Sequence, residues 1–92
     1  MTVLIDPPDW PGHGRMWSHL VSDASFDELH AFARGLDIPA RGFERDHYDV
    51  PRRLYQAAIE AGAEAVTSRE LLKRLTEAGL RRPKRRGGSL RS

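Results

Sequence analysis

The chain has 92 residues, of which 39% are hydrophobic and 30% charged, and its formal net charge is +2. This composition is typical of one small folded domain rather than a disordered segment. No apolar run approaches the roughly 20 residues of a membrane span, and the first residues lack the pattern of a signal peptide. Without cysteine, the chain has no disulfides and no thiolate zinc site. We therefore expect a cytoplasmic protein with no membrane partner.

The basic residues are concentrated at the end of the chain. Residues 81–92 hold six Lys and Arg and no acid, whereas residues 1–80 hold nine Lys and Arg and all thirteen acids. We therefore expect one compact, acidic domain over residues 1–80 and a flexible basic tail over residues 81–92. Such a tail can bind nucleic-acid phosphates through counterion release, or it can simply remain solvated.

The first half of the domain predicts two strands and one helix. Residues 3–5 form an apolar run that suits a buried strand, and two prolines then stop strand pairing. A loop rich in Pro and Gly follows, and residues 16–21 favour a short strand over a helix. Ser25 and Glu28 match a capping box, which predicts that a helix begins there and ends at residues 35–39.

The second half predicts two more strands and two more helices. Residues 40–43 suit a short strand, and the polar residues 44–49 then lead to a helix that has Pro51 in its first turn and Asp49 near its N-cap. That helix should end at Gly62.

The end of the domain has clear helix signals. Residues 63–66 suit a strand, Thr67 and Glu70 repeat the capping-box pattern, and Gly79 with Leu80 predicts a Schellman ending. Strands that alternate with helices predict an α/β fold. We expect a small sheet of three or four mostly parallel strands with about three helices.

Three stretches have a family resemblance: VLIDPPDWPGHGRMWSHLVSD, FERDHYDVP and GAEAVTSREL. Together they resemble the family of short bacterial and phage proteins called domain of unknown function 4031, over residues 2–86. The resemblance supplies no activity, but it implies a compact bacterial domain whose polar positions matter together. These positions are Asp6, Arg15, His19, Asp23, His47, Tyr48, Asp49, Arg69 and Glu70.

Several of these polar residues follow predicted strands. Parallel strands would bring their carboxyl ends, and therefore these side chains, to one edge of the sheet. Imidazole and carboxylate ligands suit manganese, iron or zinc better than calcium. We therefore predict a divalent metal ion with ligands from Asp6, His19, His47 and Asp49. The alternative is that the carboxylates cap helices or turns and the histidines bond to the backbone.

Arginines and helix starts predict an anion site beside the metal. Arg15 and Arg69 can hold a phosphate, and Tyr48 and Glu70 complete the ligand-binding set that the resemblance implies. For Arg15 and Arg69, ion pairs with nearby acids are the alternative role. Acid–base catalysis without a metal would use a histidine–carboxylate pair. The candidate catalytic residues are His19, Asp23, His47 and Asp49.

Two classes of function fit these patterns. The first is binding or metal-assisted hydrolysis of a phosphate-bearing ligand. The second is a non-catalytic nucleic-acid-associated or protein-interaction module that binds its partner through the basic tail. A core this small also gains stability from a partner subunit, so a homo-oligomer is a third possibility.

Overall fold

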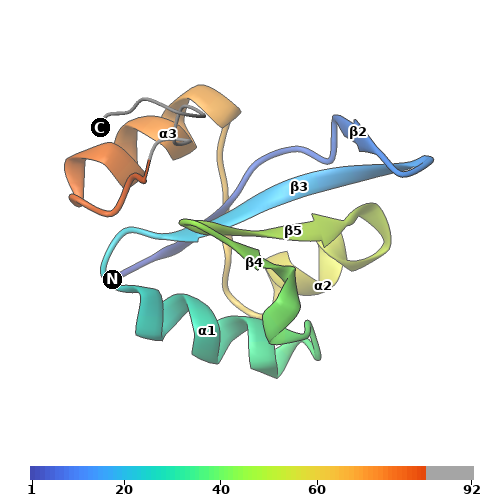
Figure 1. Ribbon diagram of the computed structural model, residues 1–92, viewed down its shortest axis with the longest axis horizontal. Helices are drawn as coiled ribbons and strands as arrows, with labels where there is room; N and C mark the ends of the chain where they lie inside the picture. Colours follow the sequence, from blue (N-terminus) through green and yellow to red (C-terminus); the bar gives the residue numbers. More distant parts are fainter. Residues whose placement is uncertain (83–92) are drawn as a thin grey trace, which may run out of the picture.

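A computed structural model describes residues 1–82, and residues 83–92, most of the expected basic tail, lie outside the described part. The fold has three layers (Figure 1). Helices α1 (Phe26–Gly35) and α2 (Tyr55–Glu60) lie on one face of a sheet, and helix α3 (Ser68–Glu77) lies on the other. No helix in residues 1–82 combines the length and apolar character needed to cross a bilayer.

The sheet is mixed and mainly antiparallel. Its strands are β1 (Val3–Ile5), β2 (Trp10–Gly12), β3 (Arg15–Ser22), β4 (Phe43–Glu44), β5 (His47–Pro51) and β6 (Glu64–Ala65). The order is β4-β5-β3-β1-β6, with β2 paired to β3. Within residues 1–82 only β1 and β6 pair in parallel. The α/β class is confirmed, but the expectation of a three- or four-stranded, mostly parallel sheet is wrong. The short β2–β3 and β4–β5 connections cannot make the long crossover that parallel pairing requires.

The polar segment before Pro51 is where the structure departs most from the sequence prediction. Its residues form the antiparallel hairpin of β4 and β5 rather than a loop. Asp49 and Pro51 both lie in β5, so Asp49 caps no helix, and α2 begins only after a 3₁₀ turn over Arg52–Leu54. Tyr48 and Val50 are buried, whereas their neighbours in β5 point to the other face. This two-residue alternation defines a strand even though half of its residues are polar.

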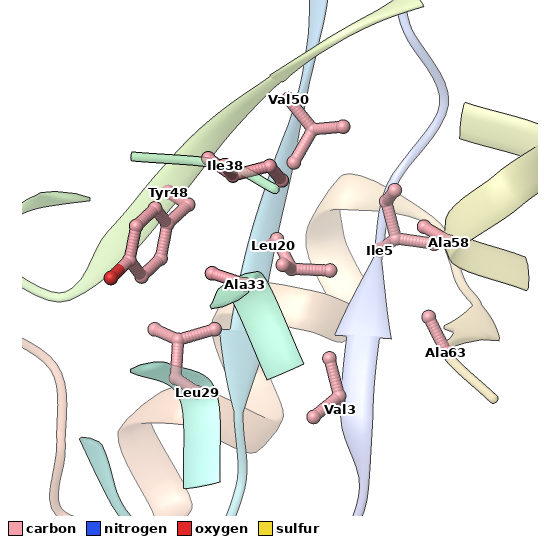
Figure 2. Close-up of a cluster of buried hydrophobic side chains, with 10 residues drawn as sticks. All are labelled: Val3, Ile5, Leu20, Leu29, Ala33, Ile38, Tyr48, Val50, Ala58 and Ala63. Atoms are coloured by element: carbon pink, nitrogen blue, oxygen red, sulfur yellow. The ribbon is translucent and has the colours of Figure 1, made fainter. Parts of the chain in front are cut away.

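The core has one cluster on each face of the sheet. Figure 2 shows the larger cluster, in which Val3, Ile5 and Leu20 meet side chains of the helices α1 and α2. The intervening residues Leu4 and Val21 point to the opposite face, where they pack with Leu71 and Leu75 of α3. Because β1 is buried on both faces, its sequence is a continuous apolar run.

The predicted helix ends are largely confirmed. The Ser25 side chain accepts a hydrogen bond from the Glu28 backbone N–H at the start of α1. Thr67 caps α3 in the same way. At the end of α3, the N–H of Leu80 donates to the Leu75 carbonyl across Gly79, whose φ is +77°. This is the predicted Schellman ending.

Two glycine substitutions test these helix ends. Gly35, at the end of α1, has an ordinary backbone conformation and open space around a new Cβ atom, so Gly35→Ala should stabilise the domain by about 0.4–1 kcal/mol. Gly79 has a positive φ, so Gly79→Ala should destabilise it by about 1 kcal/mol. Urea unfolding of the two variants and the parent protein measures both changes. Equal effects of the two substitutions would contradict the assigned helix endings.

Candidate functional site

The candidate site lies on the sheet face that α3 partly covers. His19 of β3 lies directly opposite Asp49 of β5 in the antiparallel ladder. His47 lies two residues before Asp49 and therefore projects from the same face of β5. The predicted residues thus meet on neighbouring antiparallel strands, and not at the carboxyl edge of a parallel sheet.

Two imidazoles and one carboxylate form a compact cluster. His19, His47 and Asp49 each offer one ligand atom, and these atoms all lie within 4.8 Å of one another. The two imidazole centroids are 5.1 Å apart. Nε2 of His47 lies 3.2 Å from a carboxylate oxygen of Asp49. Such a ligand set suits zinc, iron or manganese and leaves coordination positions free for water or substrate.

The buried carboxylate of Asp6 holds His19 in place. One oxygen of Asp6 lies 2.9 Å from Nδ1 of His19, and the other accepts the His19 backbone N–H at 2.6 Å. Trp10 Nε1 and the Ser68 hydroxyl donate to the first oxygen, at 3.1 and 2.7 Å. Asp6 therefore sits behind His19 instead of beside a shared ion, and it leaves Nε2 of the imidazole as the available ligand atom.

Asp46 holds His47 in the same way. Its carboxylate is 1% exposed and lies 2.9 Å from Nδ1 of His47. The second oxygen accepts bonds from the backbone N–H of Arg82 at 2.8 Å and from the Arg81 side chain at 3.3 Å. The first two residues of the expected tail thus contact the domain. Sequence reasoning missed Asp46 because these partners lie 35 and 36 positions away; its one signal was its place beside His47.

In Asp6, Asp46 and His47, hydrogen bonds and neighbouring charges together outweigh the effect of burial on the pKa. Burial acts to raise the pKa of Asp6, but hydrogen bonds from the side chain and backbone of His19 and from Ser68 lower that pKa overall. The pKa of Asp46 is lowered against its burial too, mainly by the hydrogen bond from His47. Burial acts to lower the pKa of His47, but its bonds to Asp49 and Asp46 raise that pKa overall. The two carboxylates therefore favour the protonated form of the His47 imidazole, and a bound cation would compete with that proton.

Two hollows meet at His19. The first, of about 450 Å³, is also lined by His47, by three arginines and by apolar side chains of α3. Its arginines are Arg45, Arg69 and Arg81. The second hollow is lined by Asp49 and by residues of the β2–β3 hairpin, including Trp10 and Trp17. An ion held by the cluster would therefore border a pocket large enough for a small molecule.

Two of the predicted site residues have structural partners elsewhere. Asp23 accepts hydrogen bonds from the Thr2 backbone at 2.7 Å and from Arg74 at 2.9 Å, so it ties the start of the chain to α3. Tyr48 is buried in the core on the opposite face, and its hydroxyl lies 2.6 Å from Nδ1 of His30. The structure does not bring either residue to the cluster.

The predicted anion-binding residues are separated. Arg15 lines a different hollow, together with Arg52 and Arg53. The backbone N–H of Glu70 donates to the side chain of Thr67 at the start of α3, and Glu70 does not line the pocket beside the histidines. Arg69 does line that pocket. Sequence reasoning also missed the parts that Trp10, Arg45, Ser68 and Arg81 play at the site, because they depend on how the segments fold together.

The protonation equilibrium of His47 can be measured directly. In the metal-free protein, an NMR titration of the imidazole should give His47 a pKa above the ordinary value of about 6.5. Asp49→Asn removes one neighbouring charge and should lower the pKa of His47. Asp23→Asn, at a carboxylate bound to Arg74, should leave it unchanged. A pKa of His47 at or below 6.5 in the parent would show that burial prevails over the two carboxylates.

Comparison with known proteins gives a family and no function. Searches of curated proteins and of solved structures found no match to the chain. One family, described as "Protein of unknown function (DUF4031)", matches residues 3–78. The matched region includes the cluster of His19, His47 and Asp49 and the buried carboxylates of Asp6 and Asp46. The chain belongs to the DUF4031 family.

Proposed function

We propose that this protein is a metal-dependent hydrolase of phosphate esters. His19, His47 and Asp49 would hold a divalent transition metal. The supporting observation is that each of the two facing histidines has its Nδ1 atom hydrogen-bonded to a separate buried carboxylate. Metal-binding histidines commonly use a carboxylate in this way to fix the tautomer and direction of the imidazole. Burying two carboxylates is costly, and a merely structural histidine pair would not require both.

The nature of the ligands narrows the choice of metal. Two imidazole nitrogens and one carboxylate oxygen favour zinc, iron or manganese, because calcium and magnesium prefer oxygen ligands throughout. Three protein ligands also leave room for a water molecule and for an oxygen of the substrate. These are the requirements of a catalytic site and differ from those of a closed structural zinc site.

The reaction follows from the charge of the site. A bound metal would lower the pKa of a water molecule and so supply hydroxide near neutral pH. In a phosphate monoester, the oxygen of that water would form a bond to phosphorus as the ester P–O bond breaks. The proton that the water lost would be returned to the leaving alkoxide. Arginines in the neighbouring pocket would neutralise the charge that develops on the phosphoryl oxygens. The products of a monoester would be an alcohol and inorganic phosphate.

Metal binding tests the centre itself. The full-length protein should bind about one equivalent of zinc or manganese, measured by calorimetry and elemental analysis. His19→Gln and His47→Gln each remove one ligand and should weaken binding by at least about 100-fold. The matched control is His30→Gln, because the Nδ1 atom of His30 pairs with the Tyr48 hydroxyl on the opposite face of the sheet. Circular dichroism checks that each variant folds.

Equal metal affinity in His19→Gln and His30→Gln would overturn the proposal. So would a folded parent protein that binds no transition metal. The metal-loaded protein should release phosphate from phenyl phosphate, and a chelator should abolish this release. If the metal-loaded protein releases no phosphate, the chain only binds metal and is not a hydrolase.

The buried carboxylates give a second, more specific test. Asp6→Asn and Asp46→Asn keep the side-chain shape but remove the charge that orients each imidazole, so metal affinity should fall by about 10–100-fold. Asp23→Asn, outside the cluster, should leave the metal affinity unchanged. Calorimetry on folded variants measures all three. If Asp6→Asn and Asp23→Asn bind metal equally well, the hydrogen bond behind His19 has no part in the centre.

A further inference from the structure

The pocket beside the two histidines brings three guanidinium groups together from distant parts of the chain. Arg45 lies in the turn between β4 and β5, Arg69 lies in the first turn of α3, and Arg81 follows that helix. Arginine is the side chain best matched to the planar, bidentate recognition of phosphate oxygens. The fold therefore concentrates positive charge next to the proposed metal.

The acids that line this pocket already have partners. Asp6 accepts hydrogen bonds from four donors, and Asp46 is bonded to His47, Arg81 and the backbone of Arg82. Among the ion pairs formed within residues 1–82, none involves Arg69. Arg45 pairs with Glu44 and Arg81 pairs with Asp46, so Arg69 is the guanidinium that the pocket leaves most available to an anionic ligand.

One donor of Arg45 has no acceptor. Nη1 of Arg45 donates to Glu44, but its Nε is buried and has no hydrogen-bond partner within residues 1–82. An unsatisfied buried donor is costly and uncommon in folded proteins. Arg45 also has a φ of 57°, a conformation that is rare for residues other than glycine. A phosphate oxygen could accept from this Nε only if the Arg45 side chain turned to expose it to the pocket.

The rest of the pocket surface is apolar. Leu71, Leu72 and Leu75 of α3 line it, and so does Trp10. Leu72 is 44% exposed and Trp10 is 45% exposed, so both large side chains are accessible to a ligand. A volume of about 450 Å³ is within the range of small-molecule sites. The apolar surface therefore suits a compact organic group, and the indole of Trp10 can pack against an aromatic one.

From these observations we infer that the pocket binds a phosphate monoester of a compact apolar or aromatic alcohol. The arginines would hold the phosphate, and the leucines and Trp10 would contact the organic group. The claim that this ester is the substrate rests on the proposed function. The claim that the ester binds here rests on the pocket alone. The hollow of Arg15, Arg52 and Arg53 has as many arginines but contains neither histidine of the cluster, which makes it a natural control.

The experiment measures binding of phenyl phosphate to the full-length protein after metal is removed with a chelator. Calorimetry should show one saturable site. Arg69→Gln should raise the Kd about tenfold, the loss expected for one charge-assisted hydrogen bond. Arg53→Gln, in the control hollow, should leave the Kd within about twofold. Both variants keep the basic tail, so its attraction for anions is the same in each.

A second comparison tests whether the organic group is recognised. Inorganic phosphate should bind more weakly than phenyl phosphate, because it cannot bury apolar area. Leu72→Ser should weaken the binding of phenyl phosphate and leave that of inorganic phosphate unchanged. Equal affinity for the two compounds, equal losses in Arg69→Gln and Arg53→Gln, or no saturable binding would each overturn the inference.

The failure of this inference and that of the proposed function have different signatures. If the protein binds zinc or manganese but the metal-free form does not bind phenyl phosphate, the pocket assignment is wrong and the metal centre stands. If phenyl phosphate binds with the expected dependence on Arg69 but no transition metal binds, the pocket assignment stands and the hydrolase is excluded.

Discussion

The carboxylate of Asp6 is the interaction on which the site depends. It has no exposed surface, and it lies where β1 leaves the sheet. Its four hydrogen bonds come from Trp10 of β2, from the backbone and side chain of His19 in β3, and from Ser68 at the start of α3. A buried charge is tolerated only when its hydrogen bonds are complete. The same bonds therefore stabilise the charge, join three elements and direct the imidazole of His19.

Asp46 has a parallel role behind His47, but its other bonds come from the segment that follows α3. The Schellman ending at Gly79 turns the chain away from α3, and Arg81 and Arg82 then meet the carboxylate. The Arg82 guanidinium also lies 4.4 Å from the centre of the Phe26 ring of α1. The orientation of His47 thus depends on residues that follow the last helix and lie beyond the family match at residue 78.

Features that depend on residues close together in the sequence were predicted well, and features that depend on pairing between distant segments were not. The capping residues Ser25 and Thr67 define helix starts because their partners lie three positions away. The strand His47–Pro51 resembled a polar loop before a helix, because half of its side chains face the site and its final proline suits a helix start. The predicted metal ligands were Asp6, His19, His47 and Asp49, and the structure brings only the last three together in a cluster that could hold an ion. That Asp6 and Asp46 stand behind the histidines depends on pairing between distant segments, which no local pattern specifies.

The register of β3 against β5 links the stability of the core to the geometry of the cluster. With His19 opposite Asp49, Leu20 lies opposite Tyr48, so one pairing places the polar residues on one face and the buried residues on the other. A slip of one residue would move His19 into the core and Leu20 onto the site face. The burial of Leu20, Tyr48 and Val50 therefore excludes the wrong register. The apolar face beneath α1 holds the cluster in place without contributing a ligand to it.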